Sequence, residues 1–330
     1  MEINPKLYKE LDFDQFSRYY YAKKEVDKTR KRGEKLKILD VGGYRGSTRN
    51  FLPKDDVSIL DVYNVENQVE GYKKGSALNI PYKDSSFDAV VSFDVYEHIK
   101  QKDREKYLNE LIRVSRKIII ITAPYNSPSN SKAEETINAF FKKLTNNNHP
   151  WLKEHIQNGL PEIDLIRNVA EDTDVSISEI NTNNINLWVL LQSYNILMSY
   201  LGTTNQLRKI NEFYNSHLEE IEDVNESDTY RKIFILNKTK TNKSSVENIK
   251  QNTSNGYIMK KNLELTLENK IFLALNEIIL KNRTEQERAS KEIIKLNDKL
   301  EKITYELSNM KNSRSWRMTS PLRRKSKKNT

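Results

Sequence analysis

Short apolar runs alternate with amphipathic stretches along most of the chain. Uniformly apolar runs near residues 37, 57, 88 and 117, with a further strand expected near 70, predict a parallel sheet. The apolar positions of Asp103–Ser115 recur with the helical period. This alternation predicts a doubly wound α/β sheet, in which ligands bind at the carboxyl ends of the strands. Four polar or turn-forming residues fall at those ends: Asp40, Asp61, Asp94 and Pro124.

The segments around this alternating region predict further elements. Residues 1–35 are expected to be mostly helical, with their aromatic side chains packed on the edge of the sheet. Contact of these aromatic side chains with a ligand is the alternative. Residues 125–160 are expected to form a loop with an inserted segment. The remaining patterns predict a helix over 161–170, a strand over 175–181, helices over 184–200 and 206–222, and a last strand over 230–236.

The C-terminal part has a different pattern. Residues 237–262 are rich in Lys, Asn, Ser and Thr, which predicts a polar linker. Residues 263–311 are expected to form a long helix that pairs with a second copy or with a partner's helix. Folding back onto the preceding domain is the alternative. The expectation rests on apolar residues at alternating steps of four and three, the heptad pattern of coiled coils: Ala289, Ile293, Leu296, Leu300, Ile303, Leu307 and Met310.

Charge is concentrated at the C-terminal end. The net charge is +9, and residues 311–330 carry eight of these charges and no acid, which leaves +1 for the rest (9 − 8 = 1). A nucleic-acid-binding face in the first 310 residues is therefore disfavoured. The chain has no cysteine and no apolar run that approaches the roughly 20 residues of a membrane span. We expect a cytoplasmic protein, with a basic tail over 312–330 that also suits the anionic inner face of a membrane.

Ligand-binding chemistry is concentrated after the first predicted strand. Asp40 ends this strand, and Gly42, Gly43 and Gly46 form a tight turn that lets the backbone approach a ligand closely. The spacing of the glycines does not fit the dinucleotide-binding fingerprint. Asp61 ends the second strand, at the offset where nucleotide-binding folds place an acid that hydrogen-bonds the ribose hydroxyls.

This turn and the stretch Gly75–Ile99 resemble class I S-adenosylmethionine (SAM) methyltransferases. The shared pattern is an acid before a glycine-rich turn, then an "LPF"-like turn, "FD", an apolar strand and "EH". Tyr44 stands where the family usually has a further glycine, and Ser76 where it often has Asp. The matching residues of the second stretch are Ala77, Leu78, Ile80, Pro81, Phe87, Asp88, Val90, Val91, Glu97 and His98.

The resemblance implies that residues 1–236 form a Rossmann-like sheet of seven strands, the last of them antiparallel, with SAM as cofactor. Asp40 would then hold the methionine amino group, and Asp61 would hold the ribose. Ser76 and Ala77 would meet adenine. Asp94 is a further cofactor-binding candidate, and the glycine turn would line the cofactor.

Methyl transfer to a hydroxyl requires alignment of the nucleophile and benefits from a general base with a pKa near 7. His98 is the first candidate for this base, with a packing role as the alternative, and Glu97 would orient it. His149 lies in a segment expected to cover the acceptor. The spacing of His149 and His155 departs from the i,i+4 pair that would put two ligands on one helical face. We therefore expect no metal site.

Two further stretches resemble parts of enzymes that assemble cell-surface polysaccharides. Residues 148–161 resemble a segment that lies over the acceptor. The C-terminal end resembles a tail found on such enzymes, often glycosyltransferases, through Ser313, Ser315, Trp316, Arg317, Thr319, Pro321, Leu322 and Arg323. These resemblances imply O-methylation of a nucleotide sugar or lipid-linked glycan, with a glycosyltransferase as a partner of the coiled coil.

Two other functions fit the same sequence. A scaffold that binds SAM poorly would explain the departures at Tyr44 and Ser76. An RNA methyltransferase would use the basic tail as its RNA contact.

Overall fold

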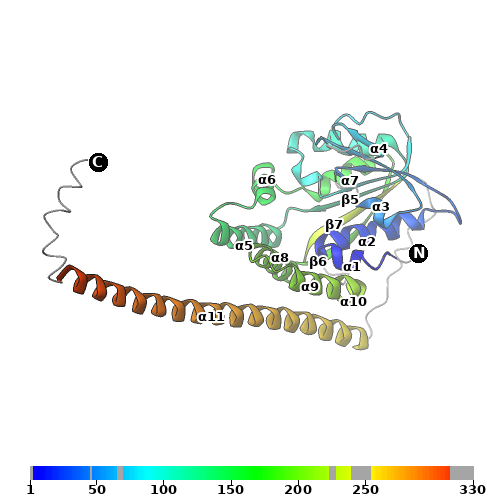
Figure 1. The fold of residues 1–330 in the computed structure, drawn as a ribbon. Helices are drawn as coiled ribbons and strands as arrows, with labels where there is room; N and C mark the ends of the chain where they lie inside the picture. The colour runs from blue at the N-terminus through cyan, green and yellow to red at the C-terminus, as the bar shows by residue number, and fades with distance from the viewer. Residues whose placement is uncertain (1–2, 45–46, 65–69, 223–227, 239–253, 313–330) are drawn as a thin grey trace, which may run out of the picture. The chain divides into compact units, whose positions relative to one another are not determined.

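The computed structural model describes residues 3–44, 47–64, 70–222, 228–238 and 254–312 (Figure 1). The chain divides into two compact units, one up to Asn269 and one from Lys270 onward. The first unit contains the α/β fold, and the second contains most of the long C-terminal helix.

The described strands form one mixed sheet in the order β3-β2-β1-β4-β5-β7-β6. β1 to β5 are parallel, and β7 is antiparallel to both of its neighbours. The predicted fold class and the antiparallel last strand are confirmed, and β7 lies between β5 and β6. The bounds are β1 (Lys37–Val41), β2 (Asp56–Asp61), β3 (Tyr72–Lys74), β4 (Phe87–Phe93), β5 (Ser115–Pro124), β6 (Ser176–Asn184) and β7 (Thr229–Asn237).

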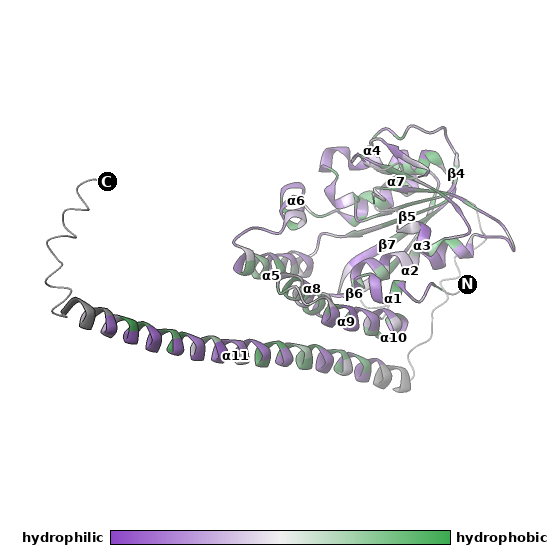
Figure 2. Cartoon of the chain, in the orientation of Figure 1, coloured by the Kyte–Doolittle hydropathy of each residue, from purple (hydrophilic) through white to green (hydrophobic). Residues whose placement is uncertain are grey.

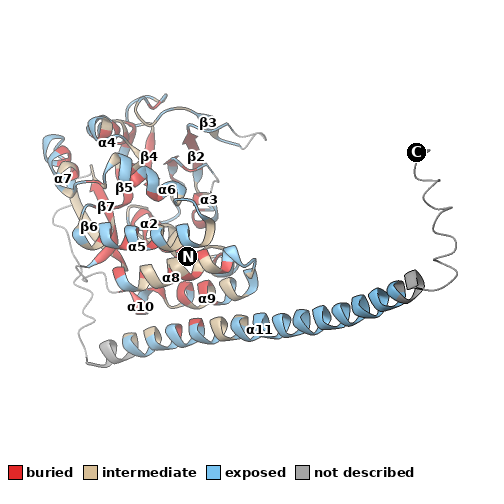
Figure 3. Ribbon diagram, turned by 90° about the vertical axis from the view of Figure 1, so that its left-hand side faces the viewer, coloured by how far each residue is buried: buried red, intermediate tan, exposed pale blue. Residues whose placement is uncertain are grey.

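Helices cover both faces of the sheet, which is why its central strands are apolar on both sides. α4 (Arg104–Val114) and α7 (Ile163–Asp172) pack on one face (Figure 1). α2 (Phe13–Lys28) and α8 (Ile185–Tyr200) pack on the other. Every residue of β4 except its last is buried, and Figure 3 shows the burial concentrated in the strands.

Most of the predicted helices are confirmed, and the long one over 206–222 is interrupted. α9 (Thr204–Ser216) and α10 (Leu218–Ile221) meet at His217, whose backbone leaves the helical region. The shorter described elements are α1 (Leu7–Glu10), α3 (Thr48–Phe51), and the 3-10 turns η1 (Tyr96–His98) and η2 (Gln101–Asp103).

The expectation of a loop over 125–160 is wrong, because two helices occupy this segment. They are α5 (Pro128–Thr145) and α6 (Pro150–Asn158). The Ser127 hydroxyl oxygen caps α5 by accepting a hydrogen bond from the Asn130 N–H at 3.1 Å. A proline begins each helix, where its fixed φ suits the first turn. These start signals outweigh the polar composition of the segment.

α11 (Ser254–Asn312) confirms the long C-terminal helix. It begins upstream of residue 263, so the end of the segment expected as a linker is helical, while residues 239–253 and 313–330 lie outside the described residues. Ile293, Leu296 and Leu300 are 58%, 56% and 62% exposed, and Figure 2 shows apolar positions recurring along the helix. Within the described chain, no helix combines the length and the hydropathy needed to cross a bilayer.

A buried charge network joins α2 to the sheet. The Arg231 guanidinium on β7, 2% exposed, donates to the carboxylates of Asp14 on α2 (Nη1 to Oδ1, 2.6 Å) and Asp94 after β4 (Nε to Oδ1, 2.9 Å). Arg18 on α2 also forms an ion pair with Asp94. Since each charge has an opposite charge within hydrogen-bond distance, the network fixes α2 against the ends of β4 and β7.

Replacing Arg231 with Met should destabilise the protein by about 3–5 kcal/mol, because two largely buried carboxylates lose a shared counter-charge. Urea unfolding followed by circular dichroism measures this loss. Arg167→Met is the matched control, since Arg167 is about half exposed and pairs with Asp164 and Glu179 at the surface. Its loss should cost about 0–1 kcal/mol. Equal losses in the two variants would contradict the role assigned to Arg231.

Candidate active site

Acidic side chains gather at one edge of the sheet. Asp40 lies near the end of β1, Asp61 ends β2, and Asp94 follows β4. Because these strands are parallel, their carboxyl ends lie on the same edge, as the sequence predicted. Three of the predicted cofactor-binding positions are therefore neighbours in the folded chain.

The Asp40 carboxyl group is fully buried beneath the glycine turn. Its Oδ2 accepts a hydrogen bond from the Thr48 hydroxyl at 2.6 Å. Its Oδ1 has no hydrogen-bond partner among the residues that the structure describes. Burial raises the pKa of Asp40 to about 7, against the opposing effect of the Thr48 hydrogen bond. One oxygen of a buried acid is thus without a hydrogen-bond donor among the described residues.

Two glycines are required where the turn passes over this acid. Gly42 has a φ of +85°, and a Cβ built there would lie 2.2 Å from Cγ2 of Val95. A Cβ on Gly43 would lie 2.2 Å from Oδ2 of Asp40. Both positions therefore exclude a side chain on steric grounds. Gly46, the third glycine of the predicted turn, lies outside the described residues.

Asp61, at the end of β2, bonds the turn that follows β1 and the turn that follows β3. Its Oδ2 accepts from the Tyr44 N–H at 3.0 Å, and its Oδ1 accepts from the Tyr63 N–H at 3.2 Å. Its backbone carbonyl accepts from the Gly75 N–H at 2.9 Å, which brings the next turn alongside. In that turn, the exposed Ser76 side chain accepts from the Leu78 N–H at 3.1 Å. The predicted ribose and adenine positions are thereby adjacent.

Asp94 occupies a different environment from the other two acids. Its Oδ1 accepts from the Thr122 hydroxyl at 2.9 Å, and both of its oxygens are bonded by Arg231. Burial raises the pKa of Asp94, but the positive charges of Arg18 and Arg231 outweigh this effect and hold the pKa below its usual value. The carboxylate is committed to bonds within the protein.

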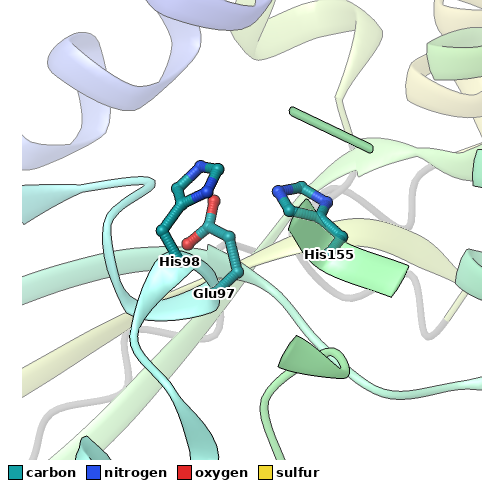
Figure 4. Close-up of side chains that lie close together, drawn as sticks. All are labelled: Glu97, His98 and His155. Carbon is teal, nitrogen blue, oxygen red and sulfur yellow. The ribbon is translucent and has the colours of Figure 1, made fainter. Parts of the chain in front are cut away.

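A second group of polar side chains lies just beyond β4. Figure 4 shows Glu97 and His98 of η1 side by side, with His155 of α6 across from them. Nδ1 of His98 lies 2.7 Å from Oε2 of Glu154, and Nδ1 of His155 lies 2.8 Å from Oε1 of Glu134. The rings of His98 and His155 are 5.0 Å apart between centroids.

Burial shifts the ionisation of Glu97 and His98 toward their neutral forms. It raises the pKa of Glu97 well above the usual value, with a further contribution from the Asp94 charge. It lowers the pKa of His98, and the neighbouring His155 adds to this effect. A neutral imidazole beside a solvent-accessible carboxylate can accept a proton near neutral pH.

The structure brings His155, and not His149, to Glu97 and His98. His149 lies at the start of α6, with its ring against Phe141 at 4.9 Å between centroids. Burial lowers the pKa of His149, and His155 contributes to this shift. Sequence reasoning set His155 aside because it tested spacing within one helix. The contact with His98 joins α6 to a turn more than 50 positions upstream, so no local pattern signals it.

Part of the chain is similar in sequence to known methyltransferases. Residues 56–119 match the family model described as a methyltransferase domain. Norajmaline N-methyltransferase from Rauvolfia serpentina is 36% identical over 94 residues, which are 27% of this chain and 31% of that protein. Ajmaline N-methyltransferase from the same plant is 32% identical over 135 residues, 34% of this chain and 46% of that protein. The chain thus matches less than half the length of either relative.

A solved structure, that of a candidate sarcosine dimethylglycine methyltransferase from Galdieria sulphuraria, aligns with a TM-score of 0.43 and 18% identity. The alignment covers 67% of this chain and 85% of that one.

Proposed function

We propose that this chain, which carries a class I SAM-dependent methyltransferase domain, is an active enzyme that methylates an acceptor bound beside η1 and α6. SAM is the methyl donor of this family. The observation that carries the proposal is the buried Asp40 carboxyl group, whose Oδ1 lacks a partner among the described residues. The methionine amino group of SAM would complete it with a charge-assisted hydrogen bond.

The neighbouring residues fit the other parts of SAM. Each Asp61 oxygen accepts one backbone N–H and keeps a second lone pair for a ribose hydroxyl. Ser76 and Ala77 stand at the adjoining turn for adenine. The turn at Gly42 and Gly43 gives the ligand a close approach to the backbone.

Asp94, which the sequence also suggested as a cofactor ligand, fits a positioning role better. Its oxygens are already bonded by Arg18, Arg231 and Thr122. Asp94 would therefore hold the end of β4 in place and fix the position of the residues that follow this strand.

Binding of SAM should depend on pH through Asp40. With a pKa of about 7, the carboxyl group of the free enzyme is protonated below that pH and cannot pair with a cation. Affinity should therefore rise with pH up to about 7 and level off above it, by at most about tenfold per pH unit. Isothermal titration calorimetry between about pH 5.5 and 7.5 measures this, below the pKa of a free α-amino group.

Asp40→Asn should weaken SAM binding by about tenfold or more and remove the pH dependence, because a neutral amide replaces the anion. Asp56→Asn is the matched control, since Asp56 is an exposed acid at the opposite end of β2. An unchanged pH profile in Asp40→Asn would rule out this role for Asp40. The absence of SAM binding in the wild type would favour the scaffold hypothesis over the enzyme.

Methyl transfer itself requires that the acceptor be aligned and deprotonated. The acceptor oxygen attacks the methyl carbon, the carbon–sulfur bond breaks with its electron pair on sulfur, and S-adenosylhomocysteine is released. His98, kept neutral by its lowered pKa, would accept the hydroxyl proton. Glu97, next to His98 in η1, would orient this imidazole, and His149 would be part of the segment over the acceptor, at the start of α6.

We propose a sugar hydroxyl, on a nucleotide sugar or a lipid-linked glycan, as the acceptor. Support comes from the likeness of residues 148–161 and of the C-terminal tail to polysaccharide enzymes, although residues 313–330 lie outside the described structure. A small-molecule amine is the second candidate. It is favoured by the two plant relatives, which are both named as N-methyltransferases.

Assays with SAM that carries a labelled methyl group distinguish these acceptors. The full chain should transfer label to nucleotide sugars as a methyl ether, and Asp40→Asn should lose most of this transfer. Magnetic resonance of the product identifies the methylated atom. Label found only in amines would contradict the sugar hydroxyl and support the amine as acceptor. Label found only in RNA would contradict both acceptors.

We also propose that α11 pairs with α11 of a second copy. Residues 1–236 would then be the catalytic domain, and α11 would serve in assembly. The exposed stripe of Ile293, Leu296 and Leu300 would be buried in such a pair. In a parallel arrangement, Glu292 would face Asn297, and Lys299 would face Thr304 of the other copy. No like charges would then oppose each other beside this stripe.

Replacing Leu296 and Leu300 together with Lys should convert a dimer of the full chain into a monomer, because two charges per helix would enter the apolar seam. Sedimentation equilibrium at micromolar concentration measures the mass. Asp298→Lys, on the opposite side of the helical repeat, is the control and should leave the dimer intact. A wild-type monomer under these conditions would contradict self-pairing.

A further inference from the structure

Two buried polar atoms beside η1 need a partner that the described residues do not provide. They are Oε2 of Glu97 and Nε2 of His155. Glu97, His98 and His155 each offer one potential ligand atom, and these three atoms lie within 4.8 Å of one another (Figure 4). Since buried polar groups are almost always paired, two unpartnered atoms in a cluster of three potential ligand atoms point to a bound species.

The outer contacts of both histidines prepare them to bind a cation. The Glu134 carboxylate accepts from Nδ1 of His155 and also from the Tyr230 hydroxyl at 2.9 Å, and Glu154 is paired with Nδ1 of His98. A carboxylate on Nδ1 holds the proton there and leaves Nε2 with a free lone pair. This arrangement of a carboxylate behind an imidazole is typical of metal-binding histidines.

We propose that Glu97, His98 and His155 form a binding site for one divalent transition-metal ion, with Zn²⁺ as the best match to the ligands. Two imidazoles and one carboxylate with an open fourth position are typical of catalytic zinc sites. Mg²⁺ and Ca²⁺ prefer oxygen ligands and fit less well. Zinc–ligand bonds of about 2.0–2.2 Å require the three atoms to close in slightly, which small side-chain rotations can provide.

The chemical role of this ion rests on the proposed function. The acceptor hydroxyl would take the open position, where the ion lowers its pKa. Its O–H bond breaks and the proton passes to water, the oxygen then bonds to the methyl carbon, and the carbon–sulfur bond breaks to release S-adenosylhomocysteine. In the metal-bound enzyme, His98 holds the ion and does not accept the proton. This proposal differs from the expectation, drawn from the spacing of His149 and His155, that the chain has no metal site.

Titration of the full chain with Zn²⁺ after removal of metals by a chelator tests the site directly. Calorimetry should show one ion bound with micromolar affinity or better. Co²⁺ should bind competitively and give the visible absorption bands of a four-coordinate ion with nitrogen ligands. No Zn²⁺ binding, or a Co²⁺ spectrum typical of six oxygen ligands, would overturn the proposal.

Variants locate the bound ion. His155→Gln and Glu97→Gln should each weaken Zn²⁺ binding by about a hundredfold or more, and Glu134→Gln by about 10–100-fold through the lost outer contact. His217→Gln is the matched control, because its imidazole lies elsewhere, with Nδ1 at 2.8 Å from the Phe213 carbonyl oxygen. Equal Zn²⁺ affinity in His155→Gln and the wild type would refute the site. Should His155→Gln not fold, His98→Gln and the wild-type Co²⁺ spectrum decide.

SAM binding, measured on the same samples, separates the two proposals. The ligand variants should bind SAM within about threefold of the wild type, because Asp40 and Asp61 are unchanged. Zn²⁺ binding without SAM binding would support the metal site and contradict the proposed enzyme function. If neither the chelator nor Zn²⁺ changes SAM binding and methyl transfer, the enzyme function is supported and the catalytic role of the metal is contradicted.

Discussion

The buried guanidinium of Arg231 constrains much of the rest of the structure. A charge removed from water is tolerated only when opposite charges and hydrogen bonds surround it. Its partners, Asp14 and Asp94, come from the first long helix and from the turn after β4, and β7 carries the arginine itself. The network therefore holds α2 against the carboxyl ends of the strands, where Tyr19 packs edge-on against Phe93 at 4.7 Å between ring centroids.

The same constraint connects the two ends of the active site. Asp94 has a left-handed φ of 51°, and its bonds to arginines hold this conformation. Val95 then packs against Gly42 on the cofactor side, and Glu97 turns toward the histidines on the other. Asp40 and Glu97 are both buried acids with an oxygen unpartnered among the described residues. Such costs persist in folded proteins mainly at functional sites, where a ligand supplies the missing bond.

Local patterns predicted most of the helices and strands and the acids that the fold brings together at the carboxyl ends of the strands. The strands, the glycine turn and the long helix each depend on residue spacing within one segment, which the sequence displays directly. The offset of Asp61 after the turn predicted its position at the end of β2, where it accepts a hydrogen bond from the Tyr44 N–H. α5 and α6 differ from the expected loop because Ser127, Pro128 and Pro150, typical residues of helix starts, outweigh the polar composition of that segment.

The sequence by itself therefore determined an α/β sheet with a glycine turn after its first strand, followed by a long helix with an apolar stripe. Only the tertiary structure decided which side chains share an environment. In the folded chain, the Asp94 carboxylate forms ion pairs with Arg18 and Arg231, and His155 lies beside Glu97 and His98. These pairings join residues far apart in the chain, and periodicity within one element contains no information about them. The physical reason is that burial and the contacts between distant side chains arise only when the whole chain is packed, and these shift the pKa values of groups such as Asp40 and Asp94.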